Sequence, residues 1–406
     1  MLIVNKQQLR QINRLVQTCC ASVQRFTFRV IFVFLCISAS SNAFSHSDGN
    51  FPKPQEDFTQ HIAEVKAHLL AKQMRQRSEA DAELNLPFER KASTSAPYRG
   101  KFLLFHGLND SPYIWRDMAD ALSERGFDVR AILLPGHGST PRAQLSMRYW
   151  RWIKTAREHM RLYRQSDTPF YLGGFSLGGV LATILAAETD DPIDGLLLFS
   201  PAYQSQRDDL LRWAGIYSKF KPWVFGGMIR EDNPVKYNSI PINAASQFYK
   251  TTRRLKKRWP RKPLSVPTLA VASAYDSIVD VDYTVKSFEK GFVGKKKLII
   301  YSNELNQPSQ AHIEYRSSAY PEQRVLNQSH QSVLVAPSNP LYGADGEVLV
   351  CNGNEWEIFS GCLFYTGTHW LGAQHTPSPD GVPVARITYN PDFSAVLDEF
   401  DALFLN

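Results

Sequence analysis

The chain has 406 residues, of which 43% are hydrophobic and 21% are charged, as expected of a globular protein with a sizeable buried core. This length allows one large domain with insertions or two domains. The first 43 residues hold five of the 46 basic side chains and none of the acidic ones, so the remainder carries 41 basic and 39 acidic side chains. The net charge of +7 is therefore no argument for nucleic acid, and we expect no nucleic-acid partner.

Residues 1–43 have the pattern of a signal peptide. Arg25 and Arg29 precede the short apolar run 30–37, and Ser41-Asn42-Ala43 is a suitable cleavage site. The run is too short to span a bilayer comfortably. We expect an exported protein, periplasmic or secreted. The alternative is an uncleaved leader that anchors the chain in the inner membrane.

Cysteine usage is consistent with export. Three of the five cysteines fall in the leader, which leaves Cys351 and Cys362. A close pair between glycine-rich segments predicts a disulfide in an oxidising compartment, and the alternative is two free thiols. No pattern of metal ligands is present, so we expect no metal.

The rest of the chain alternates between apolar runs and stretches with helical spacing. Apolar residues from Phe58 to about Ser78 recur at helical spacing, as do those of the tail from Asp392 to Leu405. We divide the chain after the leader into an N-terminal helical extension (44–96), a first core part (97–200), a cap insertion (201–263) and a second core part (264–406).

Six short apolar runs read as buried strands. They are 101–105, 129–134, 170–172, 195–199, 267–272 and 297–301. Such runs, separated by helices, predict an α/β fold with a mostly parallel sheet and helices on both faces. Functional groups in such sheets gather at the carboxyl ends of the strands.

One of these strands leads into Gly174-x-Ser176-x-Gly178, and the alanine-rich helix candidate 180–187 follows. A strand, a sharp turn and a helix are the setting of a nucleophilic serine. The two glycines fit because side chains there would collide with the neighbouring strand and helix. The alternative is a serine that only caps the helix.

Three motifs together resemble the α/β-hydrolase superfamily, and most closely its carboxylesterase and monoacylglycerol-lipase branch. They are Leu104-Phe105-His106-Gly107-Leu108, Leu134-Pro135-Gly136-His137-Gly138 and Gly174-Phe175-Ser176-Leu177-Gly178-Gly179. The resemblance implies a serine hydrolase that cleaves carboxylic esters through a Ser-acid-His triad, without a cofactor and with a cap between two core strands. Residues 333–343 resemble the segment that follows the triad histidine in some exported members.

The site residues follow from this order. Ser176 is the predicted nucleophile, and Asp276, at the end of the strand 267–272, matches the triad acid. For the base we choose His330, which ends the extended run 324–330, over His312. The backbone N–H groups of Leu108 and Leu177 are placed to form an oxyanion hole.

The cap insertion is rich in aromatic residues, which either wall an acyl pocket or form the core of the cap. Its basic run 253–262 is either a solvated surface or a contact with anionic lipid head groups. We expect a small ester or lipid-like substrate. The alternatives are a thioesterase or small-peptide hydrolase, and a non-catalytic binding protein on the same fold.

Overall fold

The computed structural model describes residues 50–72, 78–306, 310–351 and 362–405. All of them belong to one compact unit, Ser47–Asn406. The predicted signal peptide lies outside the described residues. Within the described part, no helix is both long and apolar enough to cross a membrane.

An eight-stranded sheet forms the centre of this unit, in the order β1-β3-β2-β4-β5-β6-β7-β8. All neighbouring strands run parallel except β1, which pairs antiparallel with β3 at one edge. The strands are β1 (Phe88–Arg90), β2 (Gly100–Phe105), β3 (Phe127–Ile132), β4 (Phe170–Phe175), β5 (Gly195–Phe199), β6 (Thr268–Ser273), β7 (Lys296–Ser302) and β8 (Ile313–Ser317). A separate parallel pair joins β9 (Trp370–Gly372) and β10 (Val384–Arg386).

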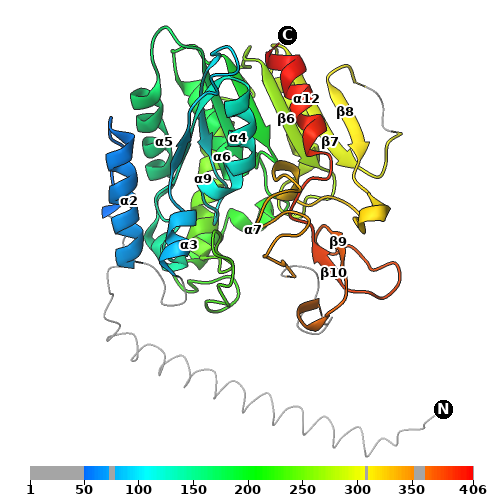
Figure 1. Cartoon of the computed structure of the whole chain (residues 1–406). Coiled ribbons are helices and arrows are strands. Elements are labelled where there is room, and N and C mark those ends of the chain that lie inside the picture. The colour runs from blue at the N-terminus through cyan, green and yellow to red at the C-terminus, as the bar shows by residue number, and fades with distance from the viewer. Residues whose placement is uncertain (1–49, 73–77, 307–309, 352–361, 406) are drawn as a thin grey trace, which may run out of the picture. The chain divides into compact units, whose positions relative to one another are not determined.

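Helices cover both faces of the sheet, as the alternation of strands and helices predicted. The side chains of β2 illustrate the division, because Leu103 and Phe105 face one core cluster and Phe102 and Leu104 the other. The first cluster packs against α5 (Tyr149–Tyr163), α6 (Leu177–Glu188), α9 (Ile242–Lys256) and α10 (Val281–Gly291). The second packs against α4 (Arg116–Glu124) and α12 (Phe393–Phe404), which lies across β6 and β7 in Figure 1.

Two strands of the central sheet lie outside the predicted set, as do β9 and β10 of the separate pair. Phe88–Arg90 lies in the predicted N-terminal helical extension, yet it adds β1 to the sheet edge. Ile313–Ser317 forms β8 at the other edge, where it pairs with β7. Both are edge strands whose side chains are mostly half-exposed, so they lack the continuous apolar run of a central strand.

The N-terminal extension forms α2 (Phe58–Lys72) and α3 (Glu79–Leu84), and α2 lies beside α5 (Figure 1). The contact includes the buried rings of His61 and His159, whose centroids are 4.9 Å apart in an edge-to-face arrangement. Among the described residues, neither ring nitrogen of His159 has a hydrogen-bond partner. Burial lowers the pKa of His159 well below its usual value, and His61 and Arg130 lower it further.

This histidine should make the protein less stable in acid. The unfolded chain binds a proton at His159 near pH 6.5 and the folded chain does not, so the free energy of unfolding is unaffected above about pH 6.5 and falls below it. His159→Phe should therefore reduce the loss of stability between about pH 7 and pH 5 by about 2 kcal/mol, measured by urea unfolding. The exposed His375 offers the control, because His375→Gln should leave that loss unchanged.

Candidate active site

Ser176 occupies a sharp turn between β4 and α6, at the carboxyl edge of the sheet. Its φ of 55° and ψ of −115° lie in a strained region for a residue with a side chain. Two backbone hydrogen bonds hold the turn, from Ser176 N–H to Phe199 O (3.0 Å) and from Ala202 N–H to Ser176 O (3.1 Å). Its side chain makes no helix-capping hydrogen bond, which removes the alternative role as a cap.

The glycines of the turn fit the predicted steric role. A β-carbon at Gly174 would lie 2.3 Å from the backbone of Gly178, in the first turn of α6. A β-carbon at Gly178 would lie 1.9 Å from the carbonyl oxygen of Phe105, at the end of β2. Close approach of strand, turn and helix therefore requires glycine at both positions.

Gly178→Ala should destabilise the protein strongly, because its new methyl group would meet strand backbone that cannot move without displacing β2. We expect the free energy of unfolding to fall by about 3 kcal/mol or more in a urea titration. Gly227→Ala is the matched control, since no heavy atom lies within 4 Å of a β-carbon at Gly227. A change of less than about 0.5 kcal/mol is expected there. Equal effects of the two variants would contradict this account.

Asp276 lies just beyond the end of β6, and its side chain is 1% exposed. One carboxylate oxygen, Oδ1, accepts hydrogen bonds from the N–H groups of Ile278 (2.8 Å) and Val279 (2.9 Å). The other, Oδ2, lies 2.5 Å from His330 Nδ1. The nearby Asp280 has a different role, because it caps α10 by accepting from Tyr283 N–H.

His330 completes the constellation with Ser176 and Asp276. Its Nε2 lies 3.0 Å from Ser176 Oγ, and its Nδ1 faces the Asp276 carboxylate. A carboxylate only accepts hydrogen bonds, so Nδ1 carries the proton and Nε2 is left to accept from the serine hydroxyl. The sequence predicted this set of three residues, and the structure brings them together.

The segment that carries His330, predicted as an extended run, belongs to neither sheet. Residues 324–330 form no regular strand, and only Val325 makes isolated bridges to other segments. Side-chain hydrogen bonds fix this loop instead. Ser200 Oγ donates to His330 O (2.9 Å), Ser273 Oγ to Gln328 O (2.5 Å) and Ser329 Oγ to Ile387 O (2.7 Å).

His312, the rival base, lies elsewhere. It precedes β8, so it is at the amino edge of the parallel sheet, whereas Ser176 is at the carboxyl edge. Its carbonyl accepts from Leu298 N–H (2.8 Å), and its ring stacks on Phe288 with centroids 6.2 Å apart. In this fold, His312 is far from the nucleophile turn.

The predicted oxyanion-hole residues lie on two backbone segments that meet at Ser176. Leu177 begins α6, and the first N–H groups of a helix have no partner within it. Leu108 follows Gly107, where a β-carbon would lie only 3.2 Å from Ser176 Cβ. His106 supports this turn from below, because its Nε2 accepts from Leu134 N–H (3.0 Å) and its Nδ1 donates to Gly107 O (2.8 Å).

A cluster of buried polar side chains lies beside the triad and was not predicted from the sequence. Lys236 Nζ donates to Gln331 Oε1 (2.8 Å), next to His330, and Tyr237 N–H donates to Asn109 O (2.7 Å). Burial raises the pKa of Asp110 to about 6, against the opposing charges of Lys236 and His330. Three distant segments supply these residues, so no local sequence pattern could reveal the group.

Cys351 and Cys362 form a disulfide, as the sequence predicted, and the residues between them are outside the described part of the chain. The two sulfur atoms and a ring nitrogen of His369 lie within 4.8 Å of one another. Disulfide sulfur is not a thiolate, and His369 Nε2 contacts the Cys362 carbonyl oxygen at 2.9 Å. We therefore assign no metal to this group.

Comparison with known proteins agrees with the fold. Residues 101–335 match the profile of the alpha/beta hydrolase fold family. The chain belongs to this family. A thermostable monoacylglycerol lipase of Bacillus sp. (strain H-257) is 28% identical over 89 residues, which are 22% of this chain and 36% of that protein. A pimeloyl-[acyl-carrier protein] methyl ester esterase of Legionella pneumophila (strain Lens) is 23% identical over 231 residues, 52% of this chain and 90% of that protein.

Solved structures of hydrolases are similar too. The monoacylglycerol lipase of Paleococcus ferrophilus has a TM-score of 0.44 at 21% identity and covers 58% of this chain and 89% of its own. A monoglyceride lipase of Saccharomyces cerevisiae has a TM-score of 0.42 at 15% identity, with 57% of this chain and 80% of its own covered. A likeness at this level says nothing about substrate. The chain is a distant homologue of esterases and lipases within its family.

Proposed function

We propose that this protein is a serine hydrolase that cleaves carboxylic esters through an acyl-enzyme. The observation that carries the proposal is the hydrogen-bonded series Ser176 Oγ, His330 Nε2, His330 Nδ1 and Asp276 Oδ2. An accepting imidazole nitrogen on the hydroxyl and a buried carboxylate behind the ring are the parts that activate a serine.

In the proposed first step, Ser176 Oγ attacks the ester carbonyl carbon while His330 Nε2 takes its proton. The buried Asp276 keeps the ring in the reactive tautomer and stabilises the imidazolium. The Leu108 and Leu177 N–H groups donate to the oxyanion, and each such donor is worth about 3 kcal/mol in comparable sites.

When the tetrahedral intermediate collapses, His330 gives its proton to the departing alcohol and Ser176 remains acylated. Water, deprotonated by His330, then attacks the acyl-enzyme. The acid leaves, and the proton returns from His330 to Ser176 Oγ. No cofactor takes part in these steps.

A substrate panel tests the reaction class. Wild-type protein is assayed with matched p-nitrophenyl esters, acyl thioesters and amino-acyl anilides. We expect the highest kcat/KM on the esters, because alkoxide and phenoxide leaving groups need less assistance than an anilide. A preference for thioesters, or hydrolysis of anilides at a similar rate, would move the assignment to a thioesterase or a small-peptide hydrolase. Hydrolysis of none would favour a binding protein.

We further propose that the protein is exported. Support comes from the leader, with its basic residues before a short apolar run, and from the disulfide between Cys351 and Cys362. The mass of the mature protein tests this, since cleavage after Ala43 should remove the leader. A full-length protein retained in the membrane fraction would favour the anchor instead.

A further inference from the structure

The segment after β5 exposes an unusual number of large apolar side chains. It contains two four-residue helices, α7 (Asp208–Leu211) and α8 (Ala214–Tyr217). We call its exposed apolar side chains the apolar cap cluster, namely Leu210, Trp213, Ile216, Tyr217, Phe220 and Phe225. They are 49% to 83% exposed. The expectation that the aromatic residues of the cap wall a pocket or form its core is wrong for these six residues, whereas Trp223 of the same segment is buried.

A basic cluster lies at the end of α9 and in the turn after it. It consists of Arg253, Lys257, Arg258, Arg261 and Lys262, all exposed. No carboxylate lies within ion-pair distance of any of them in the described part of the chain. Arg254 and Lys256 differ, because Glu188 pairs with the first at 2.7 Å and Asp208 approaches the second at 3.8 Å.

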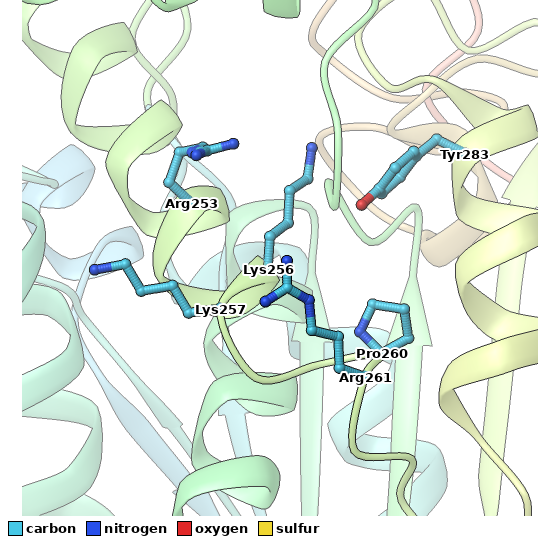
Figure 2. Close-up of a pocket in the computed structure, with 6 residues that line it drawn as sticks. All are labelled: Arg253, Lys256, Lys257, Pro260, Arg261 and Tyr283. Atoms are coloured by element: carbon cyan, nitrogen blue, oxygen red, sulfur yellow. The ribbon is translucent and has the colours of Figure 1, made fainter.

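These basic side chains surround a pocket of about 440 Å³. Arg253, Lys256, Lys257 and Arg261 line it, and Tyr283 of α10 completes the wall. In Figure 2 the Tyr283 hydroxyl points toward the space beside Lys256 and Arg261, whereas the Lys257 ammonium points away from it. Lys256 Nζ lies 4.3 Å from the centre of the Tyr283 ring. A pocket with this charge suits a phosphate-bearing group.

The apolar cap cluster and the basic cluster adjoin one another. The short helix α7 connects them, since its Asp208 approaches Lys256 at the pocket while its Leu210 is part of the apolar set. The next helix, α8, packs on α9 so closely that a β-carbon at Gly215 would lie 3.0 Å from Ser246 Oγ. Exposed apolar side chains on α7 and α8 and unpaired cations at the end of α9 therefore lie on neighbouring elements.

We propose that these two clusters dock the protein on an anionic lipid bilayer. The aromatic and aliphatic side chains of the apolar cap cluster enter the interface, and the basic cluster binds lipid phosphates. An acidic protein partner would satisfy the cations. It would not by itself explain Phe220, whose side chain is 83% exposed at a position beyond both helices.

Docking would place the active site close to lipid. The same segment begins beside the triad, where Gln206 Nε2 donates to the Asp276 carbonyl oxygen. It also returns to the site, where Lys236 meets Gln331. The inference rests on the proposed function and deepens it, because it names a lipid-like ester as the substrate.

Vesicle sedimentation tests the proposal without relying on catalysis. The full chain with Ser176→Ala is mixed with vesicles of phosphatidylcholine alone or with about one third phosphatidylglycerol, so that no lipid is hydrolysed. Adding Lys257→Glu and Arg261→Glu should weaken binding to the anionic vesicles by about 20-fold or more, since each basic side chain near such a surface is worth about fivefold. Lys53→Glu with Lys154→Glu carries the same charge change on other exposed positions and should have little effect.

A second pair of variants tests the apolar component. Trp213→Ser with Phe220→Ser should weaken binding to both kinds of vesicle, and by a similar factor, because insertion does not depend on lipid charge. The proposal would be overturned if the Lys257→Glu, Arg261→Glu variant bound anionic vesicles as strongly as the Lys53→Glu, Lys154→Glu control. Loss on charge reversal with no effect of the apolar pair would also overturn it, because the apolar cap cluster would then take no part in binding. In otherwise wild-type chains, hydrolysis of a water-soluble ester should be unchanged by either pair, which separates this result from failure of the proposed reaction.

Discussion

Ser176→Ala is expected to lower kcat for hydrolysis of a chromogenic short-chain ester by about a million-fold, the scale seen when a serine hydrolase loses its nucleophile. The reason is that Ser176 Oγ is the atom hydrogen-bonded to His330 Nε2 at 3.0 Å. Alanine keeps the backbone of the turn and removes only this oxygen. The fold should survive, so the thermal midpoint should change by only a few degrees.

Residual activity decides this prediction. The backbone N–H groups of Leu108 and Leu177 remain in the variant, so a low rate above the uncatalysed reaction is expected. Activity above about 1% of wild type, in protein free of contaminating esterase, would show that another group attacks the ester. A large drop in the thermal midpoint would show that the variant misfolds, and Ser176→Gly, which also removes the oxygen and tolerates the positive φ, would then be used instead.

His330→Ala should cost about as much as loss of the serine, because the two act as one unit. Without the imidazole, no group at hydrogen-bond distance accepts the Ser176 proton in the described structure. His312→Ala is the matched control. It removes a ring that stacks on Phe288 near the opposite edge of the sheet, and kcat/KM should stay within about twofold of wild type.

Substitution of the triad acid should lower kcat less than loss of the serine or the histidine. Asp276→Asn keeps the shape of the side chain but offers an amide to His330 Nδ1, which favours the unreactive tautomer, so a loss of about 10⁴-fold in kcat is expected. If His312→Ala were the damaging variant and His330→Ala were active, the base assignment would be wrong.

Much of the central fold could be predicted because its signals are local. Strands β2, β4, β5 and β6 are buried on both faces, so each forms an apolar run whose ends fall within a few residues of the prediction. The nucleophile turn is partly local, since Gly174 is required by its close contact with Gly178 of the same motif.

The remaining features depend on contacts between distant segments. The irregular loop before His330 is fixed by Ser200 and Ser273, which follow other strands or end them. The cluster of Asp110, Lys236 and Gln331 joins three segments that share no pattern. An apolar residue such as Phe220 reads the same in a sequence whether it is buried or exposed, so only the structure could place it on the surface.

Covalent labelling tests directly whether Ser176 is an activated nucleophile. Wild-type protein is treated with a fluorophosphonate, which reacts with an activated serine hydroxyl, and the modified peptide is identified by tandem mass spectrometry. We expect a single adduct on Ser176, which forms in step with the loss of activity. The His330→Ala variant should form no adduct. An adduct on another serine, or unmodified Ser176 in protein that hydrolyses esters, would contradict it.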